Sequence, residues 1–443
     1  MKSEIVEIQL EDNNIQKYQI ISGFNWEDLI FKSPPFNIKT IKAMARLYEV
    51  NIIPENPKKY GNLIFFHSLE DFKLDRNTDI GFIYNNQVLL NYYFNKANDN
   101  NEVEMINGVL SFKDEKINNI YKYLLKNNLV STTKGEKEDI TFFPVSSDMG
   151  YLSSLEGTKL SVNSHFFLMD ETDLDSLYDE LGTPHGLSIY RSNVYLPPLN
   201  HRECLLINYN GEVELKKLTI DDLEVKIGKH NFIPNINASF YSRPKYRVTP
   251  KCEGVAIVIV KNKVVGIKDK GEVVIPMAGF VIQTDSSIDL ENLEVEFNFT
   301  EQYMFGVQVG PTMVSNFRQL KDFESPFYRG EGTLFPSTVY PLDYNNGRAA
   351  RIGLGVKDES PILIWVEGAG KLGHIKGKES CGASLLEFSK FCKDYGIKDL
   401  VNLDGGGSAQ LIFNGKKYLK IADRHTDKVT EAERPVPYVL VIH

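Results

Sequence analysis

The sequence predicts a mixed α/β protein (α+β) whose larger, C-terminal part is rich in β-sheet and ends in a strand–helix–strand (βαβ) unit. Three observations support this fold class. From about residue 141 onward, short β-branched and aromatic runs alternate with turn residues. Near the C-terminus, an amphipathic helix pattern lies between two apolar strand-like runs. The first part of the chain carries amphipathic helix patterns of its own.

The N-terminal part is expected to form a smaller α+β domain. Two amphipathic helix patterns, within residues 38–48 and 117–125, place apolar side chains three and four positions apart. The polar segment Ser131–Asp139 suits a linker. We therefore divide the chain into residues 1–135, an accessory domain of unknown role, and residues 136–443. No catalytic constellation is recognisable in the first of these.

The strand-like runs of the second domain are short and apolar. Four of them lie within residues 187–190, 254–260, 263–267 and 273–275. The most regular run is Pro361–Val366, a strand of buried type that ends at Glu367.

A helix is expected after this strand. Ser384 is its predicted N-cap, Glu387 stands at the capping-box position, and Gly396 is the left-handed stop. Leu400–Leu403 then predicts a second buried strand, which ends at Asp404. A strand–helix–strand unit of this length places its strands parallel in one sheet, so we expect Glu367 and Asp404 to emerge side by side at one edge. Ligands bind at that edge in open α/β sheets.

Composition limits the classes of function. The 443 residues carry a formal net charge of −9, which argues against a partner that is nucleic acid or an anionic membrane. A bound phosphate would need a local basic pocket. We find no signal peptide and no run of about 18 apolar residues, and the four cysteines form no CxxC pair. These signals favour a cytoplasmic location and reduced thiols.

The loop after Asp404 has the strongest functional signal. Three consecutive glycines, Gly405, Gly406 and Gly407, let the backbone reach positive φ and bring its amides close to an anion. A tight turn into the next strand, which closes at the hairpin signal Asn414-Gly415, is the alternative. Because Asn402, Asp404 and Ser408 flank the glycines, the functional interpretation is favoured.

Other candidates are weaker when taken singly. Arg351 and Arg434 each stand at the start of an apolar run, and a guanidinium offers a phosphate two parallel donors, although most surface arginines bind nothing. Asn163 ends another strand-like run and could bind a sugar hydroxyl or cap a loop. His165 lies beside two phenylalanines, a setting that is more often packed than catalytic.

Several familiar patterns fail. Residues 373–378 are one residue short of a P-loop, and residues 406–410 lack the final glycine of a nucleophile elbow. The sequence has no HExxH motif and no Rossmann fingerprint. Triphosphatase, zinc protease and dehydrogenase functions are therefore disfavoured.

Six blocks follow one another along the C-terminal two-thirds of the chain: Val162–Phe167, Gly310–Val314, Arg351–Gly355, Glu367-Gly368, Asn402–Ser408 and Glu433–Pro437. In this order they resemble the phosphodiester glycosidase family, and the most specific is Asn-Leu-Asp-Gly-Gly-Gly-Ser, residues 402–408. Ser164 and His165 stand where the family has two glycines, Glu367 where it has an aspartate, and a helix-like insertion, Thr172–Leu181, follows the first block.

The resemblance implies a hydrolase that cleaves the bond between sugar C1 and a phosphate oxygen in a small-molecule glycosyl phosphodiester or nucleotide sugar. Asp404 would be base or nucleophile and Glu367 its acidic partner. The remaining residues would hold phosphate or substrate: Arg351, Arg434, Asn163, His165, Asn402, Gly405, Gly406, Gly407 and Ser408. A divalent cation between the two carboxylates is an alternative use of that edge.

Three other functions stay open on sequence alone. The domain could be a non-catalytic module that binds a sugar phosphate or nucleotide sugar. It could be a hydrolase that acts at phosphorus. The N-terminal region could have the leading role, in partner binding or substrate delivery.

Overall fold

The computed structural model describes most of the C-terminal two-thirds of the chain and parts of the remainder. The described ranges are residues 1–34, 64–66, 103–106, 109–126, 130–132, 150–167, 184, 186–198, 203–242, 249–260, 262–273, 275, 279–285, 294–298, 302–321, 347–424 and 433–443. Within them the protein is sheet-rich, as the sequence predicts. The expected helix within 38–48 and the insertion 172–181 lie outside the described residues.

A seven-stranded sheet positions the candidate site. Neighbouring strands of this sheet are antiparallel throughout. Its strand order is β1 (Lys2–Gln9), β2 (Ile15–Ser22), β24 (Ser360–Val366), β23 (Arg351–Lys357), β25 (Asp399–Asn402), β21 (Thr312–Ser315) and β22 (Arg318–Gln319).

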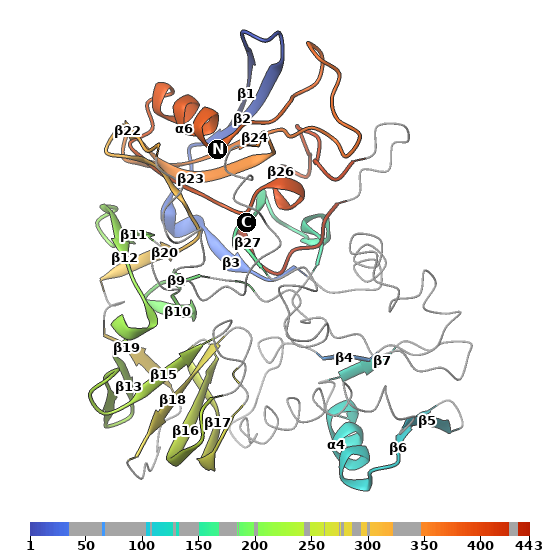
Figure 1. Ribbon diagram of the computed structural model, residues 1–443, viewed down its shortest axis with the longest axis vertical. Helices are drawn as coiled ribbons and strands as arrows, with labels where there is room; N and C mark the ends of the chain where they lie inside the picture. The colour runs from blue at the N-terminus through green and yellow to red at the C-terminus, as the bar shows by residue number, and fades with distance from the viewer. Residues whose placement is uncertain are drawn as a thin grey trace.

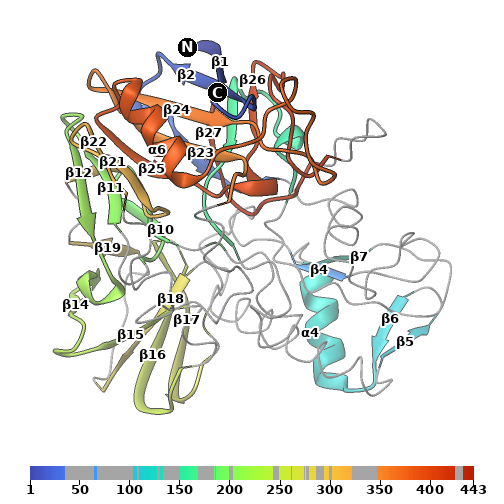
Figure 2. The ribbon, with the colours of Figure 1, turned by 45° about the horizontal axis from the view of Figure 1, so that its top comes forward.

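The helix α6 (Leu385–Asp394) covers one face of this sheet, as Figures 1 and 2 show. The Ser384 side chain accepts a hydrogen bond from the Glu387 amide, and the Glu387 carboxylate accepts one from the Ser384 amide, which is the predicted capping box. Gly396 has φ of +86°, as expected for a helix stop. The apolar stripe of α6 packs against side chains of β24, β25 and β21.

A second sheet packs on the opposite face. It is formed by β26 (Leu411–Phe413), β8 (Leu160–Asn163), β27 (Val439–Ile442) and β3 (Ile30–Lys32), in that order. The core between the two sheets includes Trp365, Leu403 and Trp26, the last from a 3₁₀ turn η1 (Trp26–Asp28). Burial of alternate side chains on both inner faces is what holds the layers together.

Three further sheets continue the chain. One contains β10 (Asn193–Leu196), β9 (Ser188–Tyr190), β20 (Tyr303–Val307), β11 (Glu203–Asn208) and β12 (Val213–Lys217). The second contains β14 (His230–Phe232), β13 (Val225–Ile227) and β19 (Val295–Phe297). The third contains β15 (Ser239–Ser242), β18 (Gly279–Thr284), β16 (Cys252–Val260) and β17 (Lys263–Gly271).

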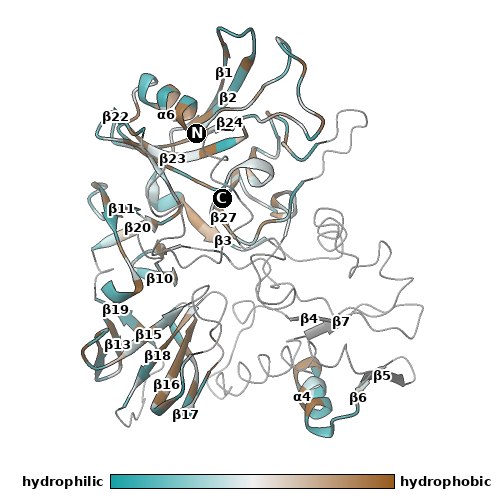
Figure 3. Ribbon diagram, viewed as in Figure 1, coloured by the Kyte–Doolittle hydropathy of each residue, from teal (hydrophilic) through white to brown (hydrophobic). Residues whose placement is uncertain are grey.

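These three sheets share a separate apolar core, and the hydrophobic colouring of β16 in Figure 3 reflects its nearly continuous burial. Among the strands expected from sequence, 254–260 and 263–267 fall within β16 and β17, and 187–190 matches β9 except for Leu187, which precedes that strand. Residues 273–275 form no assigned strand in the part that the structure describes.

The remaining described elements belong to the region between residues 64 and 132. The helix α4 (Glu115–Lys126) confirms the amphipathic pattern within 117–125, since its apolar stripe is buried. Two short strand pairs accompany it: β4 (Ile64–Phe66) with β7 (Val130–Thr132), and β5 (Val103–Ile106) with β6 (Val109–Phe112). None of the described helices is long and apolar enough to cross a membrane.

The N-terminal residues join the C-terminal sheets. β2 pairs with β24, and β3 pairs with β27. The sequence places residues 2–32 in an accessory domain, because amphipathic periodicity carries no information about which distant strand a segment pairs with. For residues 33–135, the proposed domain boundary near residue 135 stays a prediction.

Candidate active site

Three strand ends meet at one edge of the seven-stranded sheet. β24 ends before Glu367, β25 ends before Asp404, and β23 begins between them at Arg351. β24 and β25 do not pair with each other, because β23 lies between them and is antiparallel to both. The expectation that the two carboxylates leave adjacent strands is therefore wrong. The length of a strand–helix–strand unit predicts that its two strands run in the same direction, but it does not reveal whether a third strand, here β23, lies between them.

Glycines bring the three strand ends into contact. A Cβ on Gly368 would lie 2.6 Å from the Ala350 nitrogen, and one on Gly405 would lie 3.0 Å from the Ala350 oxygen. The Gly406 amide also donates to the Ala350 oxygen at 2.8 Å. With one strand between them, the backbones that carry Glu367 and Asp404 are roughly 10 Å apart, from the usual strand spacing.

Asp404 is held from several directions. Its amide donates to the Ser164 oxygen at 2.9 Å, and its carbonyl accepts from Asn163 Nδ2 at 2.7 Å. The side chain is buried, and this burial raises the pKa of Asp404 to about 7. Hydrogen bonding to Ser408, the positive charge of Arg434 and the Gly405 amide all oppose the rise in pKa. A carboxyl with a pKa near neutrality is suited to proton transfer.

Both predicted arginines lie at the triple-glycine bend. A Cβ on Gly407 would stand 2.3 Å from Arg434 Nη2, and a Cβ on Gly405 would stand 3.7 Å from Arg351 Nη1. Residues 406–408 form the 3₁₀ turn η7 (Gly406–Ser408), entered through Gly406 at φ of +59°. The absence of side chains at the bend is what admits the guanidinium groups.

The two arginines are anchored by different groups. Arg434 donates from Nε to Asp423 Oδ2 at 2.8 Å and from Nη2 to Asp423 Oδ1 at 3.1 Å, and its Nη1 donates to Ser408 Oγ at 3.4 Å. Arg351 donates from Nε to the Ala383 oxygen at 3.2 Å and from Nη2 to the Gly347 oxygen at 2.9 Å. Both side chains are thus oriented by protein contacts.

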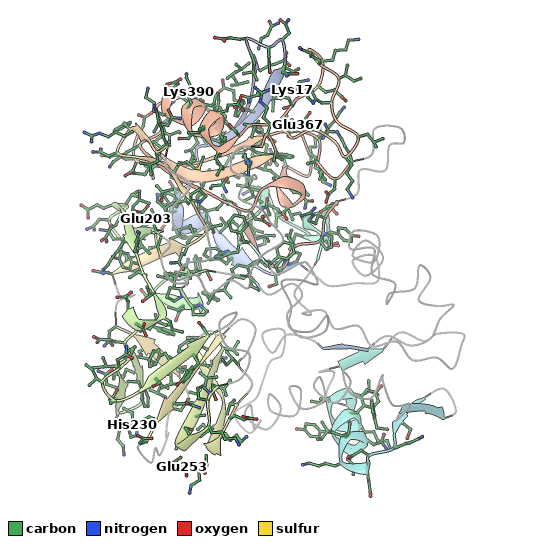
Figure 4. All side chains as sticks on the ribbon, in the orientation of Figure 1. Lys17, Glu203, His230, Glu253, Glu367 and Lys390 are labelled. Atoms are coloured by element: carbon green, nitrogen blue, oxygen red, sulfur yellow. The ribbon has the colours of Figure 1, made fainter. Side chains whose placement is uncertain are left out.

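Glu367 has a different set of contacts from Asp404. Its Oε2 accepts from the Lys420 amide at 2.8 Å, and its Oε1 lies 3.9 Å from Arg424 Nη2. Its own amide donates to the Lys17 oxygen at 2.9 Å, and Figure 4 shows the labelled Glu367 and Lys17 close together. The charge of Arg434 acts on Asp404, whereas Glu367 lies near a different arginine, Arg424.

Asn163 and His165, two of the predicted ligand contacts, have structural roles in the described protein. The Asn163 amide group spans the Asp404 carbonyl and the Gln410 amide, to which its Oδ1 is bound at 2.9 Å. His165 is 1% exposed, edge-on to Phe31 and Tyr438, with Nδ1 3.0 Å from Ser164 Oγ and Nε2 3.2 Å from the Leu187 oxygen.

These environments match the packed alternative considered for His165 and the capping alternative for Asn163. Asn402 Nδ2 lies 3.5 Å from the Gly310 oxygen, so the Gly-Pro block adjoins the site. Among the residues that the structure describes, Asn402 Oδ1 is buried and has no hydrogen-bond partner. Contact between any of these three residues and a ligand stays a prediction.

Sequence reasoning missed Asp423 and Arg424. Both are buried, and they contact opposite ends of the site: Asp423 binds Arg434, while Arg424 Nη1 donates to the Gly368 oxygen at 3.0 Å. Within the described ranges, Arg424 Nε and Nη2 have no hydrogen-bond partner. No motif surrounds this dipeptide in the sequence, so nothing short of the tertiary fold could have identified it.

The side chains around Asp404 and Glu367 do not favour binding of a divalent cation. Among the described residues, no group of three or more His, Cys, Asp or Glu side chains could hold a metal ion. Each of the two candidate carboxylates also faces a guanidinium, which would repel a dication. The four cysteines are free.

Comparison with known proteins gives a match to one family model, described as phosphodiester glycosidase, over residues 230–443. A 99-residue stretch is 28% identical to the mouse (Mus musculus) N-acetylglucosamine-1-phosphodiester α-N-acetylglucosaminidase. That alignment covers 22% of this chain and 18% of the mouse protein.

Three solved structures are similar at low sequence identity. A hypothetical protein from Synechocystis has a TM-score of 0.40 at 16% identity, over 67% of this chain and 54% of its own. The catalytic domain of the zebrafish N-acetylglucosamine-1-phosphodiester α-N-acetylglucosaminidase, auto-inhibited by its pro-peptide, has 0.35 at 16%, over 67% of each chain. A putative exported protein from Burkholderia pseudomallei has 0.39 at 11%, over 100% and 96%.

Proposed function

We propose that this chain hydrolyses a glycosyl phosphodiester, because residues 230–443 match a family model described as phosphodiester glycosidase. The bond broken would join sugar C1 to a phosphate oxygen, and the products would be the free sugar and a phosphomonoester. An N-acetylglucosamine phosphodiester or a nucleotide sugar is the proposed substrate class.

One observation carries the proposal: a buried carboxyl, with its pKa raised to about 7, directly precedes a glycine bend against which two guanidinium groups pack. Arg434 is hydrogen-bonded to Ser408, which in turn is hydrogen-bonded to Asp404. The Arg351 guanidinium packs against Gly405. The guanidinium groups and the bend amides would bind the phosphate, while Asp404 acts on the sugar side.

The chemistry needs little protonation of the leaving group. A phosphomonoester is a better leaving group than an alcohol. Cationic groups that stabilise its charge can therefore replace much of the protonation that a general acid would otherwise supply. Asp404 would activate water or attack C1, and Glu367 would be the acidic partner. The intervening strand β23 favours the wider carboxylate spacing of an inverting reaction, in which Asp404 is a base.

Turnover of defined substrates tests this function. Purified protein should release N-acetylglucosamine from an N-acetylglucosamine-1-phosphodiester or from UDP-N-acetylglucosamine, and ¹⁸O-labelled water should place its label at sugar C1. Asp404→Asn should abolish release while keeping the far-ultraviolet circular dichroism of the native chain. The matched control is Asp399→Asn, which alters a buried carboxylate on β25, the strand that precedes Asp404; this carboxylate accepts from the Asn316 amide at 2.8 Å.

The contrary outcomes point to the other functions. Label recovered in phosphate would assign the attack to phosphorus. Heat of binding with a nucleotide sugar, but no product at any pH, would make the domain a binding module. One contact favours that second candidate, since the charge of Arg434 is already paired with Asp423.

A further inference from the structure

Arg434 is bound along one whole edge of its guanidinium. Nε and Nη2 donate in parallel to the two oxygens of Asp423, at 2.8 and 3.1 Å. Two parallel hydrogen bonds fix the plane of the guanidinium as well as its position. The Asp423 side chain is 9% exposed and that of Arg434 is 12% exposed, so the pair is largely removed from water.

The backbone of the bend packs directly on this pair. A single Cβ at Gly407 would lie 2.3 Å from Arg434 Nη2 and 2.4 Å from both Asp423 oxygens. A tetrahedral phosphate is bulkier than a planar carboxylate, so it could not take the place of Asp423 without displacing Gly407. Asp423 therefore does not occupy the position of the substrate phosphate.

The opposite side of the guanidinium faces the proposed reaction centre. Nη1 lies 3.4 Å from Ser408 Oγ, and the Ser408 side chain is hydrogen-bonded to Asp404. Asp423, Arg434, Ser408 and Asp404 thus form one continuous chain of contacts. A change at Asp423 would alter the orientation of the Arg434 guanidinium, and through it the surroundings of the Asp404 carboxyl.

We propose that Asp423 is a positioning residue, which fixes Arg434 so that its Nη1 side presents donors to the substrate phosphate next to Asp404. This inference rests on the proposed function. A buried guanidinium without its carboxylate would turn toward other acceptors, because an unpaired buried charge is costly. Asp423 therefore strengthens phosphate binding, although a negative charge by itself repels phosphate.

Binding of inorganic phosphate to the full chain, followed by calorimetry, tests this separately from turnover. Asp423→Asn keeps the size of the side chain but removes its charge. It should weaken phosphate binding roughly tenfold, which is a common effect of losing a residue that orients a ligand-binding side chain. Asp423→Glu keeps the charge but lengthens the side chain against Gly407, so it should not restore the native affinity. In turnover, both variants should raise KM for the phosphodiester more than they lower kcat.

A double-mutant cycle distinguishes positioning from general stability. In an Arg434→Gln background, Asp423→Asn should change phosphate affinity by less than about twofold, since its target is gone. Asp399→Asn, the matched buried carboxylate, should leave phosphate affinity unchanged. Circular dichroism of each variant shows whether it is folded.

Two results would overturn the inference in distinguishable ways. If Asp423→Asn bound phosphate as tightly as the native chain, or more tightly, Asp423 would be a competitor or a bystander, and the proposed function would stand. If the native chain bound no phosphate and cleaved no phosphodiester, the proposed function and this inference would both fail.

Discussion

The position of Asp404 gives the site its expected pH dependence. Burial holds the pKa of this carboxyl at about 7, while Ser408 and Arg434 favour its ionised form. Free aspartate ionises near pH 4. The same residue therefore affects both catalysis and stability, in opposite directions as the pH rises.

Activity should rise with pH across neutrality. If Asp404 must be ionised to act as base or nucleophile, kcat/KM should reach half its maximum near pH 7 and fall about tenfold for each pH unit below that. A pH–rate profile of the native chain measures this. A profile that is flat from pH 5 to 8 would remove Asp404 from the ionising step.

Stability should change in the opposite sense. A folded-state pKa above the unfolded value means that the folded protein holds a proton which the unfolded chain has lost, between about pH 4 and pH 7. Stability due to Asp404 is therefore greatest below pH 4 and lost as the pH rises through 7. Relative to the native chain, Asp404→Asn should gain stability progressively between these limits, reaching on the order of 4 kcal/mol above pH 7, measured by urea unfolding.

The packing around Gly407 leaves no room for a side chain at this position. Gly407→Ala would place a methyl group against Arg434 and Asp423, and should cost about 1–3 kcal/mol of unfolding free energy together with a large loss of kcat/KM. The control is Gly415→Ala, at φ of +73° with nothing within 4 Å of its Cβ. That variant should lose about 1 kcal/mol through backbone strain and keep its kcat/KM.

At the scale of elements, the start of α6 connects helix capping to the site. The Ala383 oxygen, just before the N-cap Ser384, accepts from Arg351 Nε, and Glu387 of the capping box accepts three hydrogen bonds from Arg348. The sequence predicts this helix and its cap correctly. It does not reveal that the cap region also holds an arginine of the neighbouring strand.

Ser384→Ala should lower the unfolding free energy by about 1 kcal/mol, because one orphan amide of α6 loses its acceptor. Chemical denaturation measures the loss. Ser360→Ala, at the exposed first position of β24, should change stability by less than about 0.5 kcal/mol. Equal losses in the two variants would mean that the cap contributes nothing specific.

At the scale of the whole molecule, residues 2–32 complete the C-terminal sheets. β2 covers the edge of β24, and β3 extends the sheet next to β27. Large side chains from this segment are buried in the two cores on either face of the seven-stranded sheet: Tyr18, Ile20, Ile21, Phe24, Trp26, Leu29 and Phe31.

A chain that begins at residue 136 should therefore fail to fold. Each buried large apolar side chain contributes about 1.5–3 kcal/mol, so the loss of seven exceeds the usual net stability of a domain. Expression yield and circular dichroism measure the outcome, and covalent addition of residues 1–34 should restore the fold. A stable truncated chain with native activity would contradict the pairing of β2 with β24.

The sequence by itself determined the local features. The capping box and glycine stop of α6, the strands that end at Glu367 and Asp404, and the amphipathic helix α4 follow from side-chain periodicity and backbone preference over a few residues. The triple-glycine motif marked the bend against which Arg351 and Arg434 pack, at Gly405 and Gly407.

Only the tertiary structure decided which strand separates the two carboxylates, that an N-terminal hairpin completes the sheet, and that Asp423 holds Arg434. Strand order and charge pairing join residues far apart in the chain. They depend on which apolar faces bury each other, and local periodicity does not encode that choice.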